Sequence, residues 1–499
     1  MELRAAAFYQ RYQPSACALR PRLYHSLGEP AEAELDAFQL LLRRMGKRWE
    51  TEHLAELERA LGPAVRIAEE GDYRERRERT LAAVRDGAAL VYQPVLFGHY
   101  AGDFINGIPD LLVRTGDGYA VRDVKLARRL GGHRDITLQV GLYSWLFNQE
   151  FGTSPVALEV ALGTHEVVSL DDDGGAAAIC ELETIRQSVE AAEPAYEPVG
   201  WSKCGGCAYK DPCWAQAKAQ TDVSLLPRVD QGLARALHQL GVGTPQALLA
   251  RFDEETLRTF KRTWGEREQA VGKAAVSIMR HARAAQEGRT LHIARFPLSL
   301  DEPYVMFDLE GVPPEADELE KIYLWGMQVF GPGVRQEPFS PAVAPYGDGG
   351  DEAGWGDFLA KAGALMEAHP GIRFVHWAVY EKTAINRYIE RYGDPDGVAG
   401  RVLASLCDLL PLTQEAVVLP APSYSLKVVE RLAGFERTQD EYGGQWSIAK
   451  YIEAVETGDA ASYDALLEQV LTYNREDLEA TWAVLTWLAR NFGGEPTDA

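Results

Sequence analysis

The sequence lacks any apolar run long enough to cross a bilayer, which takes about 20 consecutive apolar residues. Its first residues, Met1 to Gln13, contain no apolar signal core, so we expect a cytoplasmic protein with no membrane partner. Basic residues are also scarce, because 51 Lys and Arg stand against 74 Asp and Glu, for a net charge of −23. This excess of acid argues against a protein that coats nucleic acid through a general positive charge.

The chain has 499 residues, too many for one ordinary hydrophobic core, so we expect an α/β multidomain protein of two or three domains. Apolar residues make up 46% and charged residues 25%, which is typical of a globular chain. Residues 1–220 mix helix and strand patterns and end in a cysteine cluster, residues 221–290 predict helices only, and residues 291–499 begin with an apolar strand and end in a long helix. The acidic, glycine-rich stretch from Tyr346 to Gly356 predicts an exposed loop.

A candidate site lies in residues 107–125, which predict a β-hairpin with its turn at Thr115–Gly118. A two-residue turn in this position places Asp110 opposite Asp123, and directly opposed β-carbons are roughly 4.5–5.5 Å apart. Lys125 follows Asp123 by two residues and therefore points to the same face of the sheet. The hairpin thus predicts two acids and a lysine in one cluster.

Two carboxylates this close repel each other unless a cation lies between them. A divalent ion held by Asp110 and Asp123 would activate water and neutralise the charge of a scissile phosphate. Lys125 would orient that water or stabilise the charge that develops on the phosphoryl oxygens. Because carboxylate oxygens are hard ligands, we expect Mg²⁺ or Mn²⁺ rather than zinc.

Pro109-Asp110 and Asp123-Val-Lys125 resemble the signature of the PD-(D/E)xK nuclease superfamily. Gln139 and Tyr143, four residues apart on one face of a predicted helix, are similar to the Q-x3-Y motif of its RecB-like branch. His53 resembles the metal-binding histidine of that branch. The resemblance implies a restriction-endonuclease-like fold with DNA nuclease activity in the first domain.

The cysteines are clustered in a way that indicates a metal rather than disulfides. Cys204, Cys207 and Cys213 form a close triplet, and Cys17 is the candidate for a fourth ligand. A structural zinc is one alternative, but zinc sites usually come as two close pairs. One distant cysteine with a C-terminal triplet resembles the 4Fe-4S arrangement of RecB-like nucleases such as the CRISPR adaptation nucleases and the AddB subunit. The remaining cysteines stand in apolar contexts and predict buried thiols: Cys180 and Cys407.

The middle segment begins with a short helix–turn–helix pattern that resembles a helix-hairpin-helix unit, a non-specific binder of phosphate backbones. That motif needs a Gly-x-Gly hairpin where this chain has Arg228-Val-Asp230. Side chains there keep the backbone amides away from a phosphate. A plain helical linker therefore stays open as the alternative.

A second candidate site lies in the C-terminal part. Asp308 and Glu310 alternate onto one face of a buried strand, and Tyr473 and Asp477 lie four residues apart on the last helix. This set resembles the DEDD exonucleases of the RNase H-like fold, in which such residues hold two metal ions for phosphodiester hydrolysis.

The DEDD pattern needs one more acid between these two elements. Glu381 occupies that place, although the usual residue is aspartate, and the extra methylene shifts the carboxylate. Asp408, on a probable strand, is a further acid with an expected structural role.

Over nearly all of its residues the chain resembles a bacterial family of RecB-like nucleases with an appended RNase H-like domain. This resemblance implies a metal-dependent DNA nuclease acting on single-stranded or frayed ends, with a second, 3′–5′ exonuclease-like domain. The implied partners are DNA and a helicase or a CRISPR or DNA-repair protein. Two alternatives stay open: a non-catalytic subunit that guides DNA to a helicase or integrase, and a nuclease directed at RNA.

Overall fold

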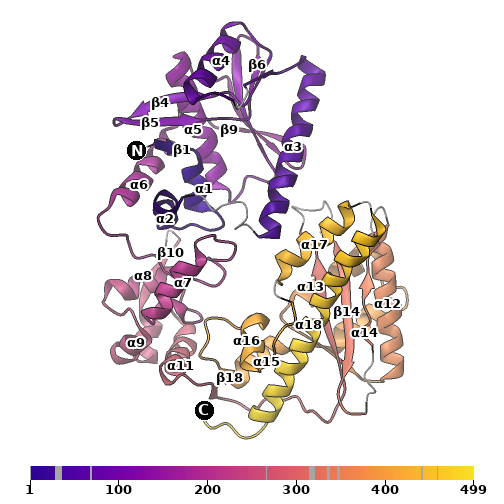
Figure 1. Cartoon of the computed structure of the whole chain (residues 1–499). Helices are drawn as coiled ribbons and strands as arrows, with labels where there is room; N and C mark the ends of the chain where they lie inside the picture. The colour runs from indigo at the N-terminus through magenta and orange to yellow at the C-terminus, as the bar shows by residue number, and fades with distance from the viewer. Residues whose placement is uncertain are drawn as a thin grey trace. The chain divides into compact units, whose positions relative to one another are not determined.

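A computed structural model describes residues 2–28, 36–67, 70–265, 267–313, 321–333, 338–345, 349–439, 442–457 and 459–498. Its contacts divide the chain into two units, residues 1–35 with 39–216 and residues 36–38 with 217–499 (Figure 1). Among the described residues, no helix combines the length and apolar character needed to cross a membrane.

The first unit is built on a six-stranded mixed sheet with the strand order β2-β3-β6-β7-β8-β9 and a smaller sheet with the order β1-β5-β4. The strands are β1 (Glu2–Arg4), β2 (Val65–Arg66), β3 (Leu90–Tyr92), β4 (Leu96–Tyr100), β5 (Asp103–Gly107), β6 (Leu111–Thr115), β7 (Gly118–Lys125), β8 (Ala157–Leu162) and β9 (Val167–Leu170). The helices are α1 (Ala6–Tyr12), α2 (Arg20–Leu27), α4 (Tyr73–Arg85), α5 (Arg134–Phe151) and α6 (Ala176–Glu190). Two further helices, α3 (Ala37–Leu61) and α7 (Lys210–Ala219), each have residues in both units.

Strand β7 has helices on both of its faces, and its alternating side chains decide which helix each residue meets. Val121 packs in the core cluster that contains Leu142 and Leu146 of α5. Val124 packs in a different cluster with Trp49 of α3. Asp123 and Lys125 share the parity of Val121, so they face α5.

The predicted hairpin register is confirmed, because Leu111 pairs with Arg122 and Thr115 pairs with Gly118. The turn uses Gly116 at φ 60°, a conformation that glycine adopts without steric cost. Asp110 lies one residue before β6, and its Oδ2 accepts a hydrogen bond from the Val124 N–H at 2.7 Å. Asp110 is therefore held against β7, although it precedes the residues of β6 that pair with β7.

Residues 221–290 contain the elements η2 (Val223–Leu225), α8 (Gln231–Gln239), α9 (Pro245–Arg251), α10 (Glu254–Thr259), β10 (Lys261–Trp264), β11 (Arg267–Ala270) and α11 (Ala274–Glu287). The expectation of helices only is wrong here, because β10 and β11 form an antiparallel hairpin. Its residues are mostly exposed and polar, so no alternation of apolar residues marks it in the sequence.

The resemblance to a helix-hairpin-helix unit rests on the start of α8. There the Asp230 carboxylate accepts the Leu233 N–H at 2.8 Å and pairs with Arg262 at 2.8 Å. Arg228 has a φ of 70° in the segment before the helix. Because the chain's own carboxylate caps α8, this helix start is not arranged as a free phosphate site, and the geometry favours the helical-linker alternative.

The rest of the second unit is built on a five-stranded sheet with the order β15-β14-β13-β16-β17. Strand β14 is antiparallel to β13, whereas β16 and β17 continue parallel to it. The strands are β12 (Leu291–His292), β13 (Tyr304–Gly311), β14 (Ile322–Phe330), β15 (Ala342–Val343), β16 (Arg373–His376), β17 (Leu406–Asp408) and β18 (Val417–Val418). The helices are α12 (Gly350–Ala368), α13 (Tyr380–Tyr392), α14 (Val398–Ser405), α15 (Leu409–Ala416), α16 (Leu426–Leu432), α17 (Gly444–Glu456) and α18 (Ala460–Phe492).

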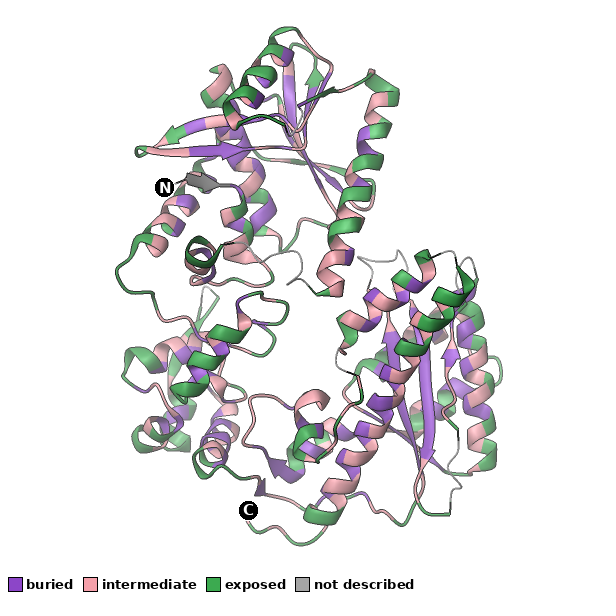
Figure 2. Cartoon of the chain, viewed as in Figure 1, coloured by how far each residue is buried: buried purple, intermediate pink, exposed green. Residues whose placement is uncertain are grey.

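The central strands of this sheet are almost wholly buried, as the purple colour in Figure 2 shows. The stretch expected to be an exposed loop is instead the start of α12 from Gly350 on, whereas residues 346–348 lie outside the described part. A β-carbon on Gly354 would come within 2.8 Å of the Ala344 Cα, so glycine here permits close packing rather than a loop.

Candidate functional sites

The first site forms where β7 passes the N-terminal end of β6. The Lys125 Nζ lies 2.6 Å from the Asp123 carboxylate, which is almost fully buried. Asp110 is held beside it through the Val124 amide. The structure thus brings together Asp110, Asp123 and Lys125, on the face of β7 that the sequence pattern predicts.

The electrostatics of this cluster combine two close carboxylates with one lysine. Burial, and then the Asp123 charge, raise the pKa of Asp110 well above its ordinary value. Burial opposes the charge of Lys125, but the Asp123 and Asp110 carboxylates outweigh it and raise the pKa of the ammonium group. Two acids that cannot both ionise cheaply are suited to a divalent cation.

Helix α5 contributes two further side chains to the cluster. Gln139 donates a hydrogen bond from Nε2 to the Tyr143 hydroxyl at 2.7 Å, so these residues share one helix face as expected. Burial, and then the Asp123 and Asp110 charges, raise the pKa of Tyr143 well above its ordinary value, although the Gln139 bond acts against the rise. Both residues therefore adjoin the acids, where they can orient a bound phosphate or water.

His53 lies on α3 and faces a different set of residues. Its ring is buried 3.4 Å from the Arg122 guanidinium and 3.8 Å from Glu56, and burial followed by the Arg122 charge lowers its pKa. Arg122 and Asp123 point to opposite faces of β7. The structure does not bring His53 to the acids, so its role as a metal ligand stays a prediction that this geometry does not favour.

Glu50, one helical turn before His53, is the α3 residue whose charge acts on Asp110. It accepts a hydrogen bond from Gln93 Nε2 at 3.1 Å, and the Gln93 N–H in turn donates to the Asp110 carbonyl at 2.8 Å. The sequence pattern gave weight to the histidine and missed this glutamate. Its position three residues earlier on the same helix face was the available signal.

The four predicted cysteine ligands lie near one another. Burial, and then the charges of Cys17, Cys207 and Cys204, raise the pKa of Cys213 to about 11. None of the cysteines forms a disulfide in the described chain. Of the two thiols expected to be buried, Cys180 is exposed on α6, so that prediction is wrong, and Cys407 is only partly buried on β17.

The first and last segments of the first unit are tied together beside these cysteines. Ser15 donates to the Lys203 carbonyl at 2.6 Å, and the Ala18 N–H donates to Glu197 at 2.9 Å. These two bonds bracket Cys17. They explain how a cysteine far away in sequence joins the C-terminal triplet.

The second site gathers the acids of β13 and α18. Candidate ligand oxygens of Asp308, Glu310 and Asp477 all lie within 4.8 Å of one another. Burial and the Asp477 charge raise the pKa of Glu310 to about 8, and burial followed by the same charge raises the pKa of Asp308 well above its ordinary value. Tyr473 is buried beside them on α18. The arrangement can hold a divalent ion.

Glu381 begins α13 and lies outside that trio. Its charge acts on Asp308, but its carboxylate is 3.1 Å from the His376 Nδ1 and is almost fully buried. Asp408 caps α15 and accepts the Ala378 and Leu410 amides at 3.0 Å, which fits its expected structural role.

Three polar residues at the second site carry no motif that would have identified them. Lys427 and Arg437 both pair with the Asp477 carboxylate, and Arg437 is also held by Glu430. Asn474 donates to Asp308 Oδ2 at 2.7 Å. In the structure, the chain's own cations therefore neutralise part of the acid cluster.

Comparison with known proteins adds family and structural matches. Among solved structures, five chains match, and one titled "Crystal structure of SSO0001" has 17% identity and a TM-score of 0.19 while covering 40% of this chain and 94% of its own. A TM-score this low supports no inference. No curated protein matches. Residues 6–214 match the PD-(D/E)XK nuclease superfamily and residues 306–489 match the RNase H superfamily. The chain therefore carries a PD-(D/E)XK nuclease superfamily domain followed by an RNase H superfamily domain.

Proposed function

We propose that this protein is a metal-dependent DNA nuclease whose first domain cuts single-stranded or frayed ends and whose second domain acts as a 3′–5′ exonuclease. The observation that carries the proposal is the cluster of Asp110, Asp123 and Lys125 inside a PD-(D/E)XK superfamily domain. The family matches alone support a nuclease-type function, and the choice of substrate is our inference.

In the first domain, Asp110 and Asp123 would hold Mg²⁺ or Mn²⁺, with Glu50 as a further acid from α3. The bound ion would supply an activated water and charge neutralisation at the phosphate. Lys125 then stabilises charge on the phosphoryl oxygens from its place 2.6 Å from Asp123. Gln139 and Tyr143 orient the phosphate from α5.

In the second domain, Asp308, Glu310 and Asp477 would hold a divalent ion. Tyr473 lies beside them and can orient the attacking water. One oxygen of the Glu381 carboxylate lies 3.1 Å from the His376 Nδ1, so this pair would compete with a second ion for Glu381. The Asp-to-Glu change at this position therefore makes the first domain the stronger candidate for cleavage.

For the cysteines we propose a structural 4Fe-4S cluster held by Cys17, Cys204, Cys207 and Cys213. The charges of Cys17, Cys207 and Cys204 all act on Cys213, which supports four thiols around one group. The preference for a cluster over a structural zinc rests on the ligand pattern of one distant cysteine and a close triplet. Thiols used this way are typical of a reducing compartment, which supports the expected cytoplasmic location.

The nuclease proposal is tested with the full chain, labelled single-stranded and duplex DNA, and Mn²⁺. Asp123→Ala and Asp308→Ala are expected to remove cleavage by the first and second domain, and the double variant is expected to be inactive. Matched controls are Asp117→Ala in the exposed hairpin turn and Asp464→Ala on the exposed face of α18. Parent-like cleavage by the double variant would contradict both site assignments.

One alternative remains supported by an observation. Because Lys427 and Arg437 neutralise Asp477, the second domain could bind nucleic acid without cutting it, as part of a subunit that guides DNA to a helicase, an integrase or a CRISPR or repair protein. Tight binding without metal-dependent cleavage would favour that function. Matched RNA and DNA strands in the same assay separate a DNA nuclease from an RNA-directed one.

A further inference from the structure

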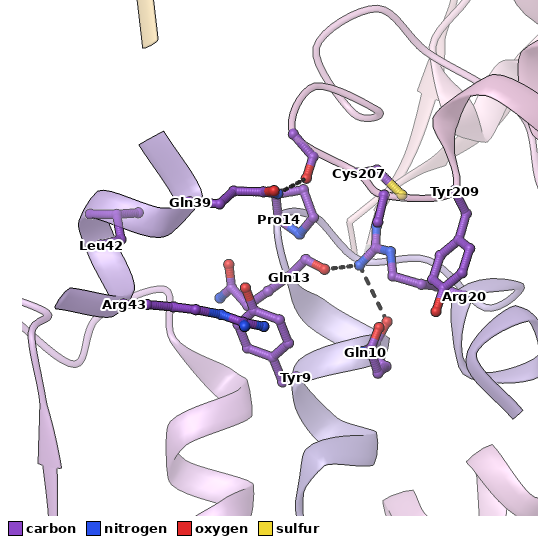
Figure 3. Close-up of a pocket in the computed structure, with 12 residues that line it drawn as sticks. Tyr9, Gln10, Gln13, Pro14, Arg20, Gln39, Leu42, Arg43, Cys207 and Tyr209 are labelled. Carbon is purple, nitrogen blue, oxygen red and sulfur yellow. Dashed lines mark hydrogen bonds between the residues drawn. The ribbon is translucent and has the colours of Figure 1, made fainter. Parts of the chain in front are cut away.

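A cavity of about 390 Å³ opens in the first unit between α1, α3 and the loop that carries Cys207 (Figure 3). It is small for a macromolecular groove and falls at the low end of the range for small-molecule sites, roughly 300–1,000 Å³. Its lining includes Arg20 and Arg43, and none of the described lining residues is acidic. In a chain with a net charge of −23, such a local composition favours an anionic ligand.

The wall on the α1 side presents an aromatic ring. Tyr9 is 58% exposed, although it lines the cavity. Burial and then the Asp135 charge raise the pKa of its hydroxyl, and the Arg20 and Arg43 charges act against that rise. Figure 3 shows the Arg43 side chain reaching from α3 toward the Tyr9 ring. An exposed ring beside a guanidinium is the combination that stacks a nucleobase and binds its phosphate.

Part of the cavity wall is held by hydrogen bonds of Arg20. Arg20 is 4% exposed and donates to the carbonyl groups of Gln10, Gln13 and Ser15. Its Nε is buried and has no hydrogen-bond partner among the described residues. A guanidinium held by three carbonyl groups keeps its positive charge fixed at the cavity wall, where it favours an anionic ligand.

Asp135 is a neighbour of both the cavity and the Asp110–Asp123 site. Gln13, which lines the cavity, donates to the Asp135 carboxylate at 2.9 Å. The Asp135 charge acts both on Lys125 of the site and on Tyr9 of the cavity. Asp135 therefore connects the cavity wall to the acid cluster, which supports a single strand occupying both.

We propose that this cavity binds one nucleotide of a single-stranded nucleic acid next to the scissile phosphate, with its base stacked on Tyr9 and its phosphate held by Arg43 and Arg20. This inference rests on the proposed nuclease function of the first domain. It assigns strand selection to α1 and α3, because a paired base cannot leave its stack to enter a site of this size without an energetic cost. It also places the Cys207 loop against the substrate.

The test measures binding separately from cleavage. Full-length protein is titrated into a fluorescent deoxythymidine oligonucleotide and into a blunt duplex, in Ca²⁺ or EDTA, and anisotropy is recorded. We expect Tyr9→Ala to weaken single-strand binding roughly 5- to 100-fold, the range for loss of one base–aromatic stack, and Tyr9→Phe to bind like the parent. Arg43→Ala should lower the salt slope of binding by about 0.7, as for one lost phosphate contact.

Arg59→Ala is the matched control, because Arg59 is exposed on the same helix about 24 Å further along its axis. Its affinity is expected to equal that of the parent. If Tyr9→Ala does not fold, as judged by circular dichroism, Tyr9→Leu replaces it. Competition by a free mononucleotide tests whether the cavity takes a nucleotide by itself, and competition at matched concentrations is expected to be weaker than by the oligonucleotide.

The outcomes separate the two proposals. Equal single-strand affinity for the parent, Tyr9→Ala and Arg43→Ala, together with cleavage that still depends on Asp123, would overturn the cavity and leave the nuclease standing. Loss of affinity in the Tyr9 and Arg43 variants of a protein that cuts nothing would support the cavity and reject the nuclease. Equal effects on duplex and single strand would overturn the assignment to unpaired nucleotides.

Discussion

Replacement of Asp110 by asparagine should make the protein more stable in the absence of metal and abolish its response to metal. Asp110 is a partly buried carboxyl group beside Asp123. Asparagine keeps an oxygen that can accept the Val124 N–H, and it leaves the ion pair of Lys125 with Asp123 at 2.6 Å intact. The variant therefore loses the repulsion between the two carboxylates and keeps the other contacts named here. We expect a gain of about 0.5–2 kcal/mol, the usual range when a destabilising functional group is removed.

The gain should depend on pH in a defined direction. Burial, and then the Asp123 charge, raise the pKa of Asp110 above its ordinary value. The unfolded chain therefore releases this proton first, and the folded state loses stability as the pH rises above the unfolded-state pKa of about 4. Below that pH both states are protonated and the cost is absent. The advantage of asparagine should accordingly vanish near pH 4 and grow toward neutral pH.

The measurement is thermal unfolding with EDTA and then with Mn²⁺, in an Asp308→Asn background so that the second site does not respond. An ion present at 100 times its Kd adds about 2.7 kcal/mol. At about 2–4 °C per kcal/mol for a domain of this size, the parent should gain roughly 5–11 °C. The asparagine variant should gain almost nothing. Asp117→Asn, exposed in the hairpin turn, should behave like the parent. An unchanged or lower melting temperature in EDTA, with the Mn²⁺ response intact, would refute the reasoning.

Four further outcomes are expected. Glu50→Gln should lower Mn²⁺-dependent cleavage more than His53→Gln, because only the glutamate charge acts on Asp110, and equal losses would restore the histidine as a ligand. Lys427→Met should bind Mn²⁺ more tightly in calorimetry, since a cation that competes for the second site is gone. Affinity at that site should fall about tenfold per pH unit below about 8, where Glu310 takes up a proton. Cys17→Ser, purified without oxygen, should lose iron and the broad visible absorbance, whereas Cys180→Ser should keep both.

Local pattern was enough to predict the residues that lie along one strand or one helix face. The β6–β7 register follows from a two-residue turn, so the face shared by Asp123 and Lys125 could be deduced from spacing alone. The same holds for Gln139 and Tyr143, which are four apart on α5. In each case the only assumption was that the strand or helix continues without interruption between the two residues.

Residues that reach a site from another element could not be found this way. Lys427 stands on α16, and nothing in the spacing from Lys427 to Asp477 encodes their contact. The choice between Glu50 and His53 depends on how α3 is rotated over the sheet, which is set by the packing of Trp49 against Val124. The β10–β11 hairpin was missed because its exposed residues bury no face and so leave no periodic signal.

The net charge of −23 affects the binding of nucleic acid only through the charges that lie close to the bound phosphates. At physiological salt, exposed charges more than about 8 Å away are largely screened, so an incoming phosphate responds to its immediate surroundings. Each acid cluster contains its own cation, Lys125 on Asp123 and Lys427 with Arg437 on Asp477. The cavity of the first unit contains two arginines and, among its described lining residues, no acid. Acidic residues elsewhere on the surface therefore do not prevent phosphate contacts at these sites, although the chain lacks the overall positive charge of a protein that coats a duplex.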